Sequence, residues 1–139
     1  MERALVIAER GAANEEIPVG ALVVAPDGTI VAEAHNESIR RHDPSAHAEI
    51  LALRRAGDTL GDHRLGGCVL VVTLEPCMMC TGAIREARLA GVVYGASDLA
   101  AGAVASMFDG LDGTDTWHMG GIEAQRCADL LRSFFKDRR

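Results

Sequence analysis

The sequence predicts a layered α/β sandwich, because helical and strand patterns alternate along a chain of ordinary globular composition. Its 139 residues are 48% hydrophobic and 24% charged, which suits one folded domain with a buried core. Residues 68–74 form a β-branched segment that is apolar on both faces, as in a central buried strand. Because strands and helices alternate, we expect some parallel pairing in the sheet. We expect residues 1–139 to form a single domain.

The N-terminal part of the chain predicts a helix followed by a hairpin. Apolar residues recur at helical spacing over residues 2–13. Two short apolar runs, residues 19–25 and 29–34, flank the turn sequence Pro26-Asp27-Gly28. Paired runs on either side of turn residues are typical of an antiparallel β-hairpin.

Two further helices are expected where prolines mark their starts. Residues 45–56 follow Pro44, have an apolar helical pattern and are expected to end at Gly57. Residues 77–88 follow Pro76 and carry basic residues in their last turn, where the helix dipole favours cations. Each helix is therefore expected to begin shortly after an extended segment.

The C-terminal part of the chain is less regular. Residues 91–95 predict a short buried strand, whereas residues 96–114 are rich in Ala, Gly and Asp and show no periodic pattern. Residues 116–119 are a candidate for a last short strand. Residues 122–139 have an amphipathic pattern and predict a final helix.

Charge and cysteine usage restrict the possible function classes. The chain has 14 basic and 20 acidic residues, a net charge of −6, which argues against a large nucleic-acid-binding face. Its four cysteines are too few for a disulfide framework. No apolar run reaches the roughly 18 residues of a membrane span, and the first residues do not resemble a signal peptide. We expect a soluble, cytoplasmic protein without a membrane partner.

A cysteine pair and a distant histidine form a candidate metal site. Cys77 and Cys80 are three residues apart at a helix start, where the thiols share one side and the helix dipole favours thiolates. This spacing alone also occurs in redox proteins and in structural zinc sites. His47 opens the preceding helix, and two helix starts that follow strands can meet at one end of a sheet. The three residues together offer three zinc ligands.

The search for a fourth ligand favours a catalytic site. Cys68 and Cys127 have no partner at ligand spacing and are interpreted as small buried residues. His42 and Asp43 precede a proline, where the chain is expected to be extended. An open zinc position holds a water molecule and lowers its pKa from 15.7 to about 7. Glu49, a carboxylate that is not a ligand, can then take a proton from this water and deliver it to a leaving group.

These motifs resemble the cytidine deaminase-like superfamily of zinc deaminases, and within it the bacterial tRNA adenosine deaminases. The signature is His47-Ala48-Glu49 followed by Pro76-Cys77-Met78-Met79-Cys80. The resemblance covers nearly the whole chain and includes residues 17–21, 42–50, 73–83 and 92–96 and the C-terminal segment from Cys127 to Arg139.

The resemblance implies a three-layer α/β/α sandwich with a mixed sheet of about five strands. It implies that His47, Cys77 and Cys80 bind one zinc ion per chain, that a catalytic water completes the site, and that Glu49 transfers protons. Asn36 matches a base-contacting residue of the family, and an Asn that caps a turn is the less favoured alternative. The resemblance also implies a homodimer.

Three functional hypotheses remain open from the sequence. The first is deamination of adenosine to inosine in the anticodon arm of tRNA, and the second is deamination of a free nucleobase or nucleoside. The third is a non-catalytic, zinc-stabilised interaction domain. The second gains support because residues 37–38, 97–101 and 111–121 lack the basic residues and other RNA contacts of the tRNA enzymes. The arginines Arg54 and Arg55 are interpreted as a solvated helix face.

Overall fold

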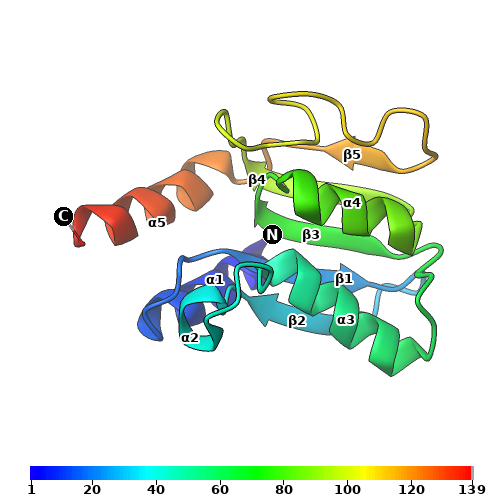
Figure 1. Ribbon diagram of the computed structural model, residues 1–139, viewed down its shortest axis with the longest axis horizontal. Helices are drawn as coiled ribbons and strands as arrows, with labels where there is room; N and C mark the ends of the chain where they lie inside the picture. The colour runs from blue at the N-terminus through cyan, green and yellow to red at the C-terminus, as the bar shows by residue number, and fades with distance from the viewer. Residues whose placement is uncertain (139) are drawn as a thin grey trace.

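Helices cover both faces of a five-stranded sheet in the computed structural model, which describes residues 1–138 (Figure 1). Within these residues the helices are α1 (Glu2–Ala13), α2 (Ser38–Arg41), α3 (Ala48–Leu60), α4 (Met78–Ala87) and α5 (Ala124–Lys136). The strands are β1 (Gly20–Val24), β2 (Ile30–His35), β3 (Val69–Leu74), β4 (Gly91–Ala96) and β5 (Trp117–Met119). None of these helices is long and apolar enough to cross a membrane.

The sheet has the strand order β2-β1-β3-β4-β5 and is mixed, as expected. Strand β1 pairs antiparallel with both β2 and β3, whereas β3 with β4 and β4 with β5 are parallel pairs. All strands except β1 therefore run in one direction, and their carboxyl ends lie at the same edge. The segments that leave β2, β3 and β4 meet at this edge, which is where sites form in α/β sheets.

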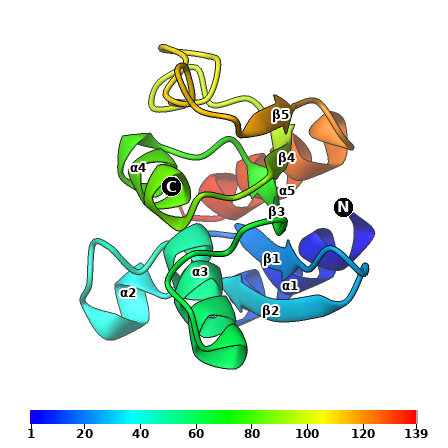
Figure 2. The ribbon, with the colours of Figure 1, turned by 90° about the vertical axis from the view of Figure 1, so that its right-hand side faces the viewer.

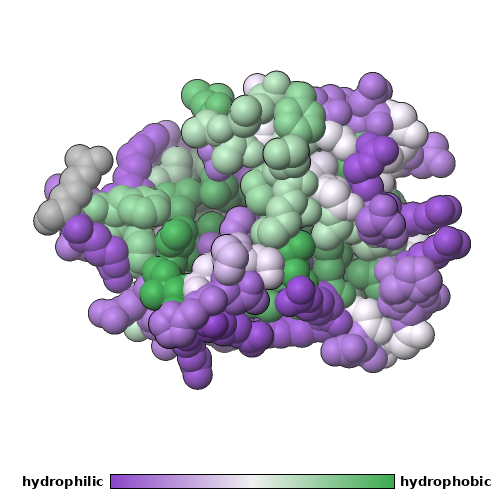
Figure 3. All heavy atoms as spheres, in the orientation of Figure 1, coloured by the Kyte–Doolittle hydropathy of each residue, from purple (hydrophilic) through white to green (hydrophobic). Residues whose placement is uncertain are grey.

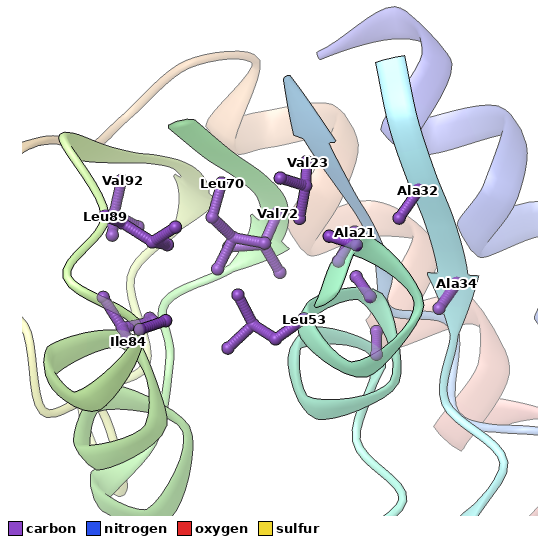
Figure 4. Close-up of a cluster of buried hydrophobic side chains, with 14 of the residues drawn as sticks. Ala21, Val23, Ala32, Ala34, Leu53, Leu70, Val72, Ile84, Leu89 and Val92 are labelled. Atoms are coloured by element: carbon purple, nitrogen blue, oxygen red, sulfur yellow. The ribbon is translucent and has the colours of Figure 1, made fainter. Parts of the chain in front are cut away.

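The three-layer arrangement is confirmed. Helices α3 and α4 lie on one face of the sheet, and α1 and α5 lie on the other (Figure 2). Between the sheet and the first of these layers, Leu53 of α3 and Ile84 of α4 pack with Leu70, Val72 and Val92 (Figure 4). Burying each of these side chains contributes about 1.5–3 kcal/mol. Successive side chains of β1 point to opposite faces of the sheet. Ala21 and Val23 belong to this core, whereas Leu22 packs with α1 on the other face.

The helix expected over residues 45–56 was placed too early at both ends. Helix α3 begins at Ala48, because Asp43 accepts hydrogen bonds from the N–H and hydroxyl of Ser45 and holds the preceding segment in a turn. The helix continues through Gly57 and ends at Gly61, which has the left-handed φ of 70°. A glycine in this conformation is a common helix terminator. The prediction that the helix ends at Gly57 was therefore wrong, because Gly61 ends it.

The short helix α2 was not predicted, and the segment before Pro44 was expected to be extended. The carboxylate of Glu16 accepts hydrogen bonds from the N–H groups of Ile39 (3.2 Å) and Arg40 (2.6 Å) and stabilises this turn. The other expected elements are confirmed within one or two residues, except that the helix expected over residues 122–139 begins at Ala124 and ends at Lys136. The expected C-terminal helix also included Arg139, which lies outside the described residues.

Candidate metal centre and substrate cavity

Two helix N-termini meet at the carboxyl edge of the sheet, as the sequence predicted. His47 is the N-cap residue of α3, and Cys77 is the N-cap residue of α4; both have extended backbone angles. Cys80 lies in the first turn of α4. The strand–proline–cysteine order after β3 and the turn held by Asp43 before α3 bring the three side chains together.

The three donor atoms have the spacing of a zinc site. His47 Nδ1 lies 3.6 Å from Cys77 Sγ and 3.4 Å from Cys80 Sγ. All three donor atoms lie within 4.8 Å of one another, and no second group of this kind occurs in residues 1–138. Tetrahedral zinc with ordinary Zn–N and Zn–S bonds places such donors about 3.5 Å apart. The residues present therefore fit the metal.

The two thiols shift each other's pKa in opposite directions. The hydrogen bond from Cys80, with a further one from His47, lowers the pKa of Cys77 to about 3. The same hydrogen bond to Cys77, together with burial, raises the pKa of Cys80. A divalent cation held by Cys77 and Cys80 would stabilise both sulfur atoms as thiolates.

Glu49 is buried next to the metal donors without being one of them. It occupies the first turn of α3, its side chain is 4% exposed, and it lines the same cavity as His47 and Cys77. Burial raises the pKa of this carboxyl group. A raised pKa brings a carboxyl group closer to the operating pH, which favours general acid–base catalysis.

Asn36 caps a helix and also lines the cavity. Its Oδ1 accepts a hydrogen bond of 2.7 Å from the backbone N–H of Ala48, so the side chain caps α3. The same side chain also lines the cavity, and its Nδ2 group donates no hydrogen bond to any residue from 1 to 138. The amide is thus oriented, and its free N–H groups are available to an acceptor in the cavity.

The cavity beside the metal donors has a volume of about 630 Å³. One wall is formed by residues 97–101, which leave β4, and another by Leu131, Arg132 and Phe135 of α5. Sequence reasoning assigned no cavity position to these α5 residues. Their spacing on one amphipathic helix face was the available signal, but core packing produces the same pattern.

Glu75 also lines the cavity, and sequence reasoning gave it no role. Burial opposes ionisation of this carboxyl group, but hydrogen bonds from Ser106 and from backbone N–H groups outweigh it and lower its pKa. The available signal was an acidic residue between a buried strand and the Cys77 helix start, where a charge is unusual unless it is paired.

Comparison with known proteins identifies the family of this site. Residues 1–96 match the model of the cytidine and deoxycytidylate deaminase zinc-binding region. The chain belongs to this deaminase family. Zinc is the cofactor of the family, and His47, Cys77 and Cys80 of this deaminase are positioned to bind it. The family resemblance, the fold and the zinc cofactor expected from the sequence are therefore confirmed.

Two relatives differ in how much of their length this deaminase matches. It is 43% identical to the tRNA-specific adenosine deaminase of Haemophilus influenzae, over 100% of this chain and 83% of the relative. It is 45% identical to the tRNA(Ile)-lysidine synthase of Deinococcus radiodurans, over 97% of this chain. The chain spans only 24% of that second relative.

Two solved structures are similar to the deaminase fold described above. One comes from a study of A-to-I editing by tRNA:A34 deaminases at the wobble position, with a TM-score of 0.90 and 38% identity over 94% of this chain and 97% of that chain. The other is guanine deaminase from Bacillus subtilis, with a TM-score of 0.66 and 43% identity over 69% of this chain and 61% of that chain.

Proposed function

We propose that this chain is a zinc-dependent hydrolytic deaminase that converts adenosine to inosine at the wobble position of tRNA. The observation that supports hydrolytic deamination is the buried carboxyl group of Glu49. It lies beside three donor atoms that are spaced for zinc, and it lines a cavity of about 630 Å³. The similarity to the Haemophilus influenzae enzyme over the whole chain and to the tRNA:A34 deaminase structure supports the substrate.

In this proposal His47, Cys77 and Cys80 hold zinc, and Glu49 moves protons. Zinc bound by these residues supplies a Lewis acid that lowers the pKa of an attacking water molecule to about 7. Glu49 accepts a proton from the water and delivers it to adenine N1 as the oxygen bonds to C6. Glu49 then carries the remaining hydroxyl proton to the amino nitrogen, and the C6–N6 bond breaks. One water molecule is consumed and one ammonia is released for each inosine formed.

Asn36 orients the base in this proposal. Because its Oδ1 already accepts the N–H of Ala48, its Nδ2 donors are the groups that we assign to the base. They pair with an acceptor such as a ring nitrogen on the purine edge. The largely aliphatic wall of residues 97–101 and the side chains of Leu131 and Phe135 exclude water from the base.

The alternative is deamination of a free nucleobase or nucleoside, such as guanine, cytosine or adenosine. The net charge of −6 and the absence of a cation in residues 97–101 favour it, because phosphate contacts supply much of the affinity for RNA. The similarity to guanine deaminase from Bacillus subtilis points the same way.

A substrate panel separates the two functions. Ammonia release is measured on a tRNA anticodon stem-loop, adenosine, guanine, cytosine and cytidine, with one zinc ion per chain verified beforehand. We expect turnover of the stem-loop that carries adenine at the wobble position and none of a matched stem-loop with guanine there. Turnover of a free base without turnover of the adenine stem-loop would refute the tRNA assignment.

We also propose that the protein is a homodimer. Hydrophobic residues gather over α4 and the connection beside it, with hydrophilic residues around them (Figure 3). Met78 on α4 is 69% exposed, and Met107 and Phe108 in the connection are 59% and 46% exposed. Large exposed apolar patches mark interaction sites. Sedimentation of the wild-type protein is expected to give twice the chain mass of 14.7 kDa. The variant Phe108→Asp is expected to shift the protein towards the monomer. A monomeric wild-type protein would contradict this proposal.

The remaining proposals concern place and organisation. We propose that residues 1–139 act as one zinc-dependent deaminase domain and that the protein works in the cytoplasm, where it meets tRNA. A single cooperative unfolding transition of the zinc-loaded chain tests the first proposal, and fractionation of cells that express the full chain tests the second.

A further inference from the structure

One buried carboxylate accepts five hydrogen bonds from the segment after β4. Glu75 is 2% exposed and directly follows β3. Its Oε2 accepts the backbone N–H groups of Val104 (3.2 Å), Ala105 (2.9 Å) and Ser106 (2.9 Å). Its Oε1 accepts the N–H of Asp98 at 3.1 Å and the hydroxyl of Ser106. Five donors on one carboxylate leave little freedom at either end of residues 98–106.

The segment held by Glu75 is the wall of the cavity. Residues 97–101 line it, and Asp98 Oδ1 accepts the N–H groups of Ala100 and Ala101 at 3.1 Å each, which shapes the turn. The N–H of Ala103 donates to the carbonyl oxygen of Pro76 at 2.8 Å. The wall is therefore tied to the segment that carries the metal-binding cysteines.

Gly102 shows how closely the wall fits the carboxylate. A Cβ atom at this position would lie 2.3 Å from the carboxyl carbon of Glu75 and 2.5 Å from its Oε1. Side chains other than hydrogen do not fit there without displacement of the carboxylate or the wall. Glu75 and Gly102 thus form one complementary unit next to the cavity.

We infer that Glu75 is a positioning residue that fixes the cavity wall of residues 97–101 against the metal centre and so sets how tightly the substrate base is held. The inference rests on the proposed deaminase function. Residues 97–116 connect β4 to β5 without a helix or strand of their own, and long connections of this kind are mobile unless they are anchored. Glu75 provides that anchor through the hydrogen bonds that its carboxylate accepts from residues 98–106.

The variant Glu75→Gln tests the inference, because glutamine keeps the size but replaces one acceptor oxygen by a donor group. Whichever oxygen is replaced, an NH₂ group then faces at least two donors. We expect one zinc ion per chain, amide hydrogen exchange at Asp98, Val104, Ala105 and Ser106 at least tenfold faster, and a KM at least tenfold higher on the stem-loop with kcat within threefold. Asp109→Asn is the matched control, because Asn retains the single acceptor that Asp109 Oδ1 offers to the N–H of Leu111.

A second variant guards against loss of folding in the first. Gly102→Ala keeps the residue Glu75, but its added methyl group displaces the carboxylate or the wall. We therefore expect the same faster amide hydrogen exchange and the same higher KM as for Glu75→Gln. Wild-type exchange and KM in the zinc-loaded, folded variants would overturn the inference. Loss of zinc from both variants would also overturn it, since Glu75 would then support the metal centre rather than the wall. If the wild-type protein does not turn over the stem-loop, the proposed function fails, while hydrogen exchange without substrate still decides the role of Glu75.

Discussion

At the scale of single residues, a substitution of Glu49 tests whether the zinc site is catalytic or only stabilises the fold. Glu49→Gln keeps the volume of the side chain and removes its ability to transfer protons. We expect kcat to fall at least 100-fold, as is usual when a general acid–base group is lost, with one zinc ion per chain and an unchanged circular dichroism spectrum. Unaltered ammonia release by this variant would favour the non-catalytic interaction domain.

One substitution separates the capping of α3 by Asn36 from the base contact that we propose for it. Asn36→Asp keeps an acceptor for the N–H of Ala48 at the start of α3, where the helix dipole favours a negative charge. It removes the Nδ2 donors that we assign to the base. We expect the free energy of unfolding to stay within about 1 kcal/mol of wild type and kcat/KM to fall at least tenfold, about 1.4 kcal/mol. Asn36→Ala loses both the cap and the donors, so we expect it to lower both the free energy of unfolding and kcat/KM. Full activity of Asn36→Asp would rule out the proposed base contact.

At the scale of elements, Glu16 stabilises a helix that lies far from it in the sequence. Glu16→Ala removes a buried carboxylate and leaves the part-buried N–H groups of Ile39 and Arg40 without their acceptor. We expect a loss of about 2 kcal/mol in the free energy of unfolding, measured by urea titration of the zinc-loaded protein. Glu9→Ala, on the exposed face of α1, is the control and is expected to have little effect. Equal stabilities of the two variants would contradict this role of Glu16.

The elements also show which features sequence reasoning can predict. Strands β1, β3 and β4 and helix α1 were predicted because burial imposes a period that the residues carry locally. The start of α3 depends on the turn at Asp43 and also on Asn36, which lies 12 residues before Ala48. The existence of α2 depends on Glu16, which lies 23 and 24 residues before Ile39 and Arg40. Such tertiary hydrogen bonds leave no periodic pattern, so the boundaries were wrong where they act.

The same distinction applies to the site. His47, Cys77 and Cys80 were predicted to meet because donor type and spacing at two helix starts are local features. Glu75 was missed because its partners, residues 98–106, belong to a segment without a pattern. The α5 contribution depends on how the last helix packs across the sheet, which the amphipathic face of α5 alone does not specify.

At the scale of the whole molecule, a net charge of −6 is unfavourable for binding RNA, and the cavity wall of residues 97–101 has no basic residue to contact a phosphate. Leu99 lines the cavity and is 84% exposed, so a cation placed there reaches any phosphate that passes over the wall. We expect Leu99→Lys to bind the stem-loop more tightly at low salt and to steepen the slope of log K against log salt by about 0.7, the value for one phosphate on a single strand. Leu60→Lys adds the same charge at the exposed end of α3, outside the cavity lining, and is expected to leave the slope unchanged. Identical slopes for Leu99→Lys and wild type would mean that no phosphate crosses this wall, and the acidic charge would then favour a free base as the substrate.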